Sequence, residues 1–340
     1  MEHEFWMKRA LELAEGGKFH ASPNPLVGAV LVQDGQLISE GYHVKRGKGH
    51  AEVECLRKVS ADFDLSKATL YVTLEPCAHF GLTPPCSHLI VSRNITKVVI
   101  ATRDPFPQVN GQGIKYLKEQ GVQVVEGIME KEARWQNRRF ITAHRLGRPY
   151  ITLKWAESAD GFIDYPRSSG ELGSLAISSP ESGSWTHTLR SQTDGIAIGT
   201  NTFITDNPSL ATRHVAGPNP IPLVFSNTIS DLGKSQLSAN QESILLNDTN
   251  LDFGAKLAWV FQEKNITSVL VEGGAQLLQS CIDHSLWDEC HIIASNTRIG
   301  DGLKAPQLPE NSLLLKKSTI PTDNTYTQLL NPNIHDILNF

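Results

Sequence analysis

The residues with the clearest chemical potential are a histidine, a glutamate and two cysteines in the first quarter of the chain. His50 and Glu52 are two positions apart, and Cys77 and Cys86 each directly follow a proline. Imidazole and thiolate are good zinc ligands, and three protein ligands leave a fourth coordination position for water. The pattern therefore predicts a zinc site with His50, Cys77 and Cys86 as its ligands.

Glu52 is predicted to have a different role, because it can lie beside the metal without binding it. Two positions after His50, at the start of a helix, its carboxylate can face the open coordination position. Zinc lowers the pKa of its bound water, and a neighbouring carboxylate can take that proton and deliver it to a ring nitrogen and a leaving amine. We therefore expect Glu52 to be catalytic.

A structural zinc site is the alternative to a catalytic one. It would normally have a fourth protein ligand, for which His79 and His88 are candidates, and it predicts that Glu52→Gln has no measurable effect. The signature of zinc nucleobase deaminases is H-x-E followed by P-C-x-x-C. Here eight residues, Ala78–Pro85, separate the two cysteines.

Three predicted elements position these groups. Residues 50–58 are predicted as a helix, residues 69–74 as a β-strand, and residues 85–92 as a helix opened by prolines. Cys86 then lies in a first helical turn, where the positive helix end favours a thiolate.

The remainder of the first half predicts an α/β arrangement with mostly parallel later strands. The predicted elements are a helix at 4–15, a hairpin from 26–32 and 37–42 around Asp34-Gly35, strands at 97–101 and 122–125, and a helix at 113–120. Residues 130–145 are predicted as one charged helix, followed by a linker at 146–149. These signals predict two domains, residues 1–146 and 147–340.

The second half shows another α/β pattern. Strands are predicted at 150–155, 195–199, 223–226 and 268–271, with a helix at 179–191. Gly273-Gly274 opens a further helix that reaches about Cys281, and this turn is either a phosphate cradle or an ordinary structural turn. Because no G-x-G-x-x-G sequence follows a strand, a Rossmann domain is not expected.

Composition limits the classes of function. The 340 residues carry a formal net charge of −5 without a dense basic cluster, which argues against a nucleic-acid partner. No apolar run is long enough for a membrane span, and the first residues do not form a signal peptide. Five cysteines are an odd number, so we expect free thiols and a cytoplasmic protein.

Taken together, these residues resemble the bacterial bifunctional riboflavin-pathway deaminase–reductases over nearly the whole chain. The matching segments are Pro23-Asn24-Pro25, Val27–Val30, Gly41-Tyr42-His43, Gly49–Glu52, Thr73–Cys77, Thr83–Cys86, Asp104–Gly113, Lys154-x-Ala156-x-Ser158-x-Asp160-Gly161, Asp194–Gly199 and Val271–Gly274. The long stretch between the two cysteines separates this family from cytidine and transfer-RNA adenosine deaminases.

The resemblance implies a cytidine-deaminase-like three-layer sandwich followed by a dihydrofolate-reductase-like α/β domain. In the first domain, Asn24 and His43 would line the pyrimidine pocket beside Glu52. Leu82 stands where the family often carries a basic residue.

In the second domain, the resemblance implies an NADPH site and a site for a ribose phosphate. The cofactor would lie along Ala156, Thr202, Asp206, Gly273 and Gly274. The substrate would be held by Lys154, Ser174, Arg190, Asp206, Leu210, Arg213 and Glu272. Ala176 stands where the family usually has an aromatic residue, and Asn207 where it often has aspartate.

The implied activity has two steps, with zinc and NADPH as cofactors. The first domain would deaminate 2,5-diamino-6-(5-phosphoribosylamino)pyrimidin-4-one, and the second would reduce the ribose of the resulting uracil derivative. Asp206, Glu272 and Lys154 are the candidates for the proton donor in the reduction. A deaminase with an inactive second domain and a nucleic-acid deaminase stay open as alternatives. Family members are commonly homo-oligomers, on which this sequence is silent.

Overall fold

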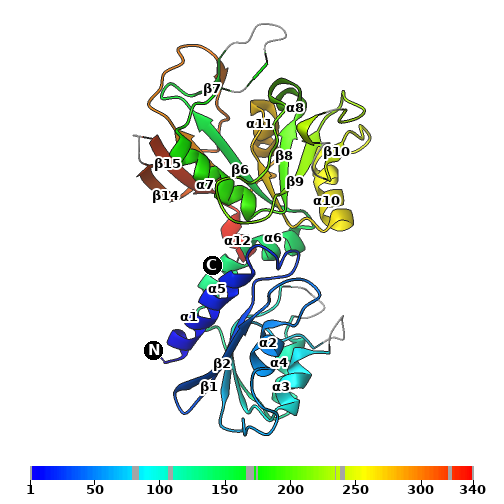
Figure 1. Ribbon diagram of the computed structural model, residues 1–340, viewed down its shortest axis with the longest axis vertical. Coiled ribbons are helices and arrows are strands. Elements are labelled where there is room, and N and C mark those ends of the chain that lie inside the picture. Colours follow the sequence, from blue (N-terminus) through cyan, green and yellow to red (C-terminus); the bar gives the residue numbers. More distant parts are fainter. Residues whose placement is uncertain are drawn as a thin grey trace. The chain divides into compact units, whose positions relative to one another are not determined.

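The computed structural model describes residues 2–78, 84–105, 110–165, 172–173, 175–233, 235–237, 242–320 and 324–338. The chain divides into two compact units, residues 1–146 and residues 147–339 (Figure 1). Each unit has its own β-sheet and hydrophobic core. Among the described residues, no helix is both long and apolar enough to cross a membrane.

The sheet of the N-terminal unit has five strands in the order β2-β1-β3-β4-β5. They are β1 (Gly28–Gln33), β2 (Gln36–Tyr42), β3 (Thr69–Leu74), β4 (Lys97–Thr102) and β5 (Gln123–Glu126). β1 pairs antiparallel with β2 and β3, whereas β3, β4 and β5 are parallel. Asp34 and Gly35 join β1 to β2 with φ angles of 51° and 73°, as a two-residue hairpin turn requires. The predicted hairpin and parallel strands are confirmed.

Helices cover both faces of this sheet. They are α1 (Glu2–Ala14), α5 (Glu130–Gln136), α2 (Ala51–Leu56), α3 (Cys86–Ser92) and α4 (Gln112–Glu119). Alternate residues of β1 face opposite ways: Val30 packs in a core with Met7 of α1, and Leu31 packs in another with Cys55 of α2 and Ile90 of α3. The unit is therefore the predicted three-layer sandwich.

The prediction of a single helix over residues 130–145 is wrong. The chain instead forms α5 and α6 (Arg138–Leu146), which meet at Asn137. The Asn137 amide is buried, and it donates to the Leu26 carbonyl and accepts from the Leu26 N–H, both at 2.8 Å. The helix break therefore places a side chain that satisfies the backbone of the loop before β1.

The sheet of the C-terminal unit has eight strands in the order β10-β9-β8-β11-β6-β12-β15-β14. They are β6 (Tyr150–Glu157), β8 (Gly195–Gly199), β9 (Ile221–Phe225), β10 (Ile244–Leu246), β11 (Ser268–Val271), β12 (Glu289–Ala294), β14 (Leu313–Ile320) and β15 (Asn324–Leu330). The six strands from β10 to β12 are parallel, and β15 and β14 continue the sheet antiparallel. A short second sheet pairs β7 (Phe162–Asp164) with β13 (Leu303–Lys304).

Helices also cover both faces of this sheet. They are α7 (Pro180–Ser191), α8 (Thr200–Asp206), α10 (Phe253–Lys264), α11 (Ala275–Asp283) and α12 (Ile334–Leu338). Leu153 and Val269 share one core with Leu257 of α10 and Leu278 of α11, and Leu189 of α7 belongs to a second core. The prediction of an α/β fold for this unit is confirmed.

Candidate active sites

The N-terminal unit brings the three predicted zinc ligands together. His50 is the N-cap of α2, Cys77 follows β3, and Cys86 is the first residue of α3. His50 Nδ1 lies 3.6 Å from Cys77 Sγ and 3.3 Å from Cys86 Sγ, and the three ligand atoms are all within 4.8 Å of one another. Ligands of a tetrahedral zinc at bond lengths of about 2.0–2.3 Å have such separations, so the donor set fits the metal.

The cluster favours a catalytic site over a structural one. Within the described part of the chain, only these three side chains form a metal-binding group. The His88 ring instead stacks on Tyr116, with 4.2 Å between ring centroids. The other candidate for a fourth ligand, His79, lies outside the described residues, as does Leu82.

Electrostatics at the cluster match the chemistry predicted for it. The hydrogen bond with Cys86, together with the nearby His50, lowers the pKa of Cys77 to about 4, which favours the thiolate form that binds zinc. Glu52 is 3% exposed, and its carboxyl group lies within hydrogen-bonding reach of Cys86. Burial, and then the charge of Cys77, raises the pKa of Glu52 to about 7. A carboxyl group with this pKa can both take up and release a proton near neutral pH.

Asn24 and His43 lie beside this cluster and hold each other in place. Asn24 Nδ2 is 3.0 Å from His43 Nε2, and His43 Nδ1 is 3.1 Å from the Gly49 carbonyl oxygen. This geometry fits a neutral ring in which Nδ1–H donates to Gly49 and Nε2 accepts from the Asn24 amide. Burial lowers the pKa of His43 and so favours that neutral form. The His43 and His50 rings are in edge contact, 5.6 Å between centroids.

Glu75 is a buried carboxylate that sequence reasoning did not single out. Its Oε2 accepts from the N–H groups of Asp104 and Gly111, and its Oε1 from those of Gly113 and Ile114, over 2.9–3.3 Å. A Cβ on Gly113 would lie 1.8 Å from the Pro76 carbonyl oxygen, so α4 starts directly against the turn that carries Cys77. A charged residue immediately after an apolar strand is the sequence signal that could have revealed it.

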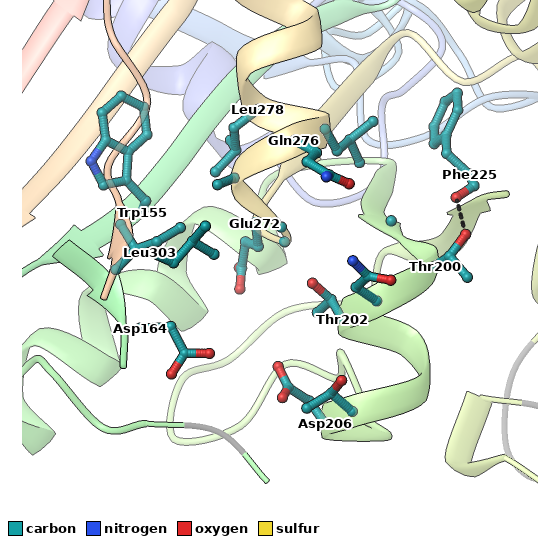
Figure 2. Close-up of a pocket in the computed structure, with 18 of the residues that line it drawn as sticks. Trp155, Asp164, Thr200, Thr202, Asp206, Phe225, Glu272, Gln276, Leu278 and Leu303 are labelled. Atoms are coloured by element: carbon teal, nitrogen blue, oxygen red, sulfur yellow. Dashed lines mark hydrogen bonds between the residues drawn. The ribbon is translucent and has the colours of Figure 1, made fainter. Parts of the chain in front are cut away.

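The C-terminal unit contains a cavity of 1540 Å³ at the carboxyl ends of its parallel strands. Seven predicted residues line it: Lys154, Ala156, Thr202, Asp206, Glu272, Gly273 and Gly274. Figure 2 shows Glu272, Thr202 and Asp206 near its middle, with Trp155 and Leu303 on one side and Thr200 and Phe225 on the other. Ala176 also lines the cavity, whereas Ser174 lies outside the described residues.

Gly273 and Gly274 are required by the backbone at the start of α11. A Cβ on Gly273 would lie 2.7 Å from Ile198 Cγ2 and 2.9 Å from Thr202 Cγ2, and Gly274 has a φ of 76°. The turn therefore brings bare backbone to the cavity wall beside the positive end of a nine-residue helix. This arrangement fits a phosphate group of a dinucleotide.

Glu272 lines this cavity and forms a bidentate ion pair with Arg190, which is not among the lining residues. Arg190 Nε donates to Glu272 Oε1 at 2.8 Å and Nη2 to Oε2 at 2.6 Å. Although burial opposes ionisation, the Arg190 charge lowers the pKa of Glu272. Burial lowers the pKa of the neighbouring Lys154. Two of the Arg190 donors are therefore already used by Glu272, and the ion pair keeps Glu272 ionised.

Arg213 and Leu210 are not among the lining residues of the cavity. The Arg213 N–H donates to Nδ1 of His187 at 3.0 Å, so a buried histidine that we did not predict positions this arginine. The Leu210 side chain is 3% exposed in the core, and its φ of 52° is left-handed. A substrate contact from Leu210 would have to come from its backbone.

Comparisons with known proteins agree with this division of the chain. The family described as the cytidine and deoxycytidylate deaminase zinc-binding region matches residues 1–102, and the RibD C-terminal domain matches residues 149–328. A riboflavin biosynthesis protein RibD from Aquifex aeolicus is 34% identical, covering 93% of this chain and 94% of its own length. RibD from Escherichia coli is 42% identical over 63% of this chain and 56% of its own length.

Two solved structures match over almost the entire length. RibD from Acinetobacter baumannii superimposes with a TM-score of 0.86 at 31% identity, covering 97% of this chain and 98% of that one. A diaminohydroxyphosphoribosylaminopyrimidine deaminase/5-amino-6-(5-phosphoribosylamino)uracil reductase from Thermotoga maritima gives the same TM-score, identity and coverage.

The fold, the zinc-ligand cluster and the second cavity define a zinc-dependent deaminase joined to a reductase. The chain belongs to the RibD family of riboflavin biosynthesis proteins, which are bifunctional deaminase–reductases. The fold class predicted from the sequence is confirmed, as are the two enzyme classes and the zinc and NADPH cofactors.

Proposed function

We propose that residues 1–146 hydrolyse the 2-amino group of 2,5-diamino-6-(5-phosphoribosylamino)pyrimidin-4-one. The observation that carries this proposal is the convergence of His50, Cys77 and Cys86 beside the buried Glu52. His50, Cys77 and Cys86 would hold zinc, which supplies a Lewis acid for the activation of water. Glu52 takes the first proton from the attacking water and delivers it to the ring nitrogen, and it then carries the second, hydroxyl proton to the leaving amine, so that a carbonyl group and ammonia are formed.

Asn24 and His43 are proposed to bind the pyrimidine. Because His43 Nδ1 is committed to Gly49, the ring is fixed beside the metal ligands, and it in turn orients the Asn24 amide. The amide group can then exchange its contact with His43 for a hydrogen bond to the substrate ring.

Residues 147–340 are proposed to reduce the ribose of 5-amino-6-(5-phosphoribosylamino)uracil with NADPH. Ala156, Thr202, Asp206 and the Gly273-Gly274 turn would hold the cofactor, which supplies a hydride to C1′ of the ribose. One proton is taken up as the sugar ring opens to the ribityl chain. We assign the proton to Lys154, because Arg190 holds Glu272 in its ionised form whereas burial makes the Lys154 ammonium a stronger acid.

Lys154, Ser174, Arg190, Asp206, Leu210, Arg213 and Glu272 are the residues proposed around the reductase substrate. Arg213 and Lys154 would supply positive charge for the phosphate monoester, and Arg190, whose charge is paired with Glu272, would contribute hydrogen-bond donors. An inactive second domain is not favoured, since the family match covers this unit and seven of the predicted residues line one large cavity.

Two assays test the two steps separately. Zinc-loaded protein should release ammonia from the diaminopyrimidine substrate without NADPH, and it should then oxidise NADPH with the deaminated product. Absence of ammonia from zinc-replete protein would overturn the deaminase assignment. Absence of NADPH oxidation would overturn the reductase assignment alone.

We also propose that the enzyme works in the cytoplasm on small molecules instead of nucleic acid. All five cysteines are free thiols, and four are buried. Reducing surroundings suit such thiols, and the net charge of −5 does not attract a phosphate backbone.

A further inference from the structure

Lys256 is a buried cation at the start of α10. Its side chain lines the cavity and is 6% exposed. Nζ donates to Asn227 Oδ1 at 3.2 Å. Among the described residues, no carboxylate oxygen lies within 4.0 Å of this ammonium. A buried ammonium group with only a neutral partner lacks a countercharge, which is costly unless an anion binds there.

Lys256 lies in a different part of the cavity from the reacting groups. The lining residues include two cations, Lys154 and Lys256. Lys154 interacts with Glu272 and Arg190. Lys256 instead contacts Asn227, two residues after Phe225, and Figure 2 shows Phe225 across the cavity from Trp155 and Leu303. The two cations therefore serve different chemical groups.

The order of groups along the cavity matches the order of groups in NADPH. The nicotinamide must reach the substrate near Lys154, and the bare backbone at Gly273 suits the pyrophosphate. The adenosine half then extends toward Phe225 and Lys256. NADPH differs from NADH only by the 2′-phosphate of this adenosine, so the end of the cavity that receives it is where a cation can distinguish the two cofactors.

We infer that Lys256, held by Asn227, binds the 2′-phosphate of NADPH and gives the reductase its preference for NADPH over NADH. This inference rests on the proposed reductase function. Asp252 also lines this end, but its Oδ1 caps α10 by accepting from the Ala255 N–H at 2.7 Å. The Asp252 carboxylate is therefore hydrogen-bonded to the N-terminus of α10. Lys256 is the group that attracts an anion at this end of the cavity.

The test compares Lys256→Met with the wild-type full-length, zinc-loaded protein. Kd values for NADPH and NADH are measured by the quenching of protein fluorescence, and those for adenosine 2′,5′-bisphosphate and 5′-AMP by calorimetry. The Kd of NADPH and of the bisphosphate should rise by about 10- to 100-fold, the loss expected for a hydrogen bond to a charged group. The Kd of NADH and of 5′-AMP should change by less than about twofold on the same scale.

Two matched variants separate recognition from folding. Lys256→Arg keeps the charge and should retain most of the discrimination, whereas Lys264→Met removes an exposed lysine of the same helix and should change none of the four Kd values. An unchanged far-UV circular dichroism spectrum and an unchanged temperature at which NADPH oxidation is lost show that the C-terminal unit of each variant is folded. Equal weakening of NADPH and NADH in Lys256→Met, or no weakening of either, would overturn the inference. Wild-type protein that binds both cofactors equally would overturn it while leaving the reductase assignment intact, and failure to bind either would overturn both.

Discussion

Replacing Glu75 by glutamine should destabilise the N-terminal unit strongly. The carboxylate accepts four backbone N–H groups, two at each oxygen. A glutamine amide keeps one acceptor oxygen and presents N–H groups where the other oxygen was, so two of those four N–H groups lose their acceptor. At about 1–3 kcal/mol for each unsatisfied buried donor, the free energy of unfolding should fall by about 2–6 kcal/mol. For a unit of this size, where each kcal/mol shifts the midpoint by about 2–4 °C, that loss lowers the unfolding midpoint by roughly 4–24 °C.

The bifunctional chain allows this effect to be assigned to one unit. Samples heated through a temperature series are assayed for residual ammonia release and for residual NADPH oxidation. Only the loss of deaminase activity should move to lower temperature in Glu75→Gln. Glu119→Gln on the exposed face of α4 is the matched control and should shift neither curve measurably. A Glu75→Gln protein whose deaminase survives heating as well as wild type does would refute the reasoning, since the four hydrogen bonds would then contribute little.

Three further predictions concern single groups in the two sites. Glu52→Gln should retain zinc by metal analysis yet lose ammonia release by about 10²-fold or more; loss of the metal would show that Glu52 is a ligand. Gly273→Ala places a Cβ 2.7 Å from Ile198 and should weaken NADPH binding in a fluorescence titration while NADPH-independent deamination persists; unchanged affinity would show that the turn adapts. Burial, and then the charges of the nearby arginines, lowers the pKa of His187 to about 4, so the unfolded chain binds the proton more tightly. Stability should therefore fall as pH drops from about 6.5 to 4, and in acid denaturation curves His187→Gln should flatten this dependence; an identical slope would contradict it.

The zinc cluster could be predicted because each of its members is fixed by a local signal. His50 stands at a helix start, Cys77 follows an apolar strand, and Cys86 opens a helix after two prolines. Parallel pairing of β3 with β4 and short connections then leave few ways to arrange these termini. Long-range folding thus brings together groups whose individual positions already follow from the sequence.

The last third of the C-terminal unit could not be predicted in the same way. Buried polar residues interrupt the apolar pattern by which its strands would be recognised in the sequence. β12 carries Glu289 and His291 on a buried face, where an apolar alternation would be expected. Glu289 accepts hydrogen bonds from the Tyr150 hydroxyl at 3.0 Å and from the Gln328 amide. Tyr150 and Gln328 lie on β6 and β15, the two neighbours of β12, so the partners that make this strand stable are distant in sequence.

The reductase site shows a second limit, which concerns charge. Considered one at a time, Lys154 and Arg190 are cations that could bind a phosphate, and Glu272 is a carboxylate that could bind the substrate. In the structure Arg190 and Glu272 neutralise each other through two hydrogen bonds, and Lys154 contributes the remaining positive charge. Burial lowers the pKa of Lys154, whereas the neighbouring Glu272 raises it and Arg190 lowers it, so the acidity of this ammonium depends on both members of the ion pair. The chemistry of this site therefore depends on which charges pair, and pairing is a property of the folded chain.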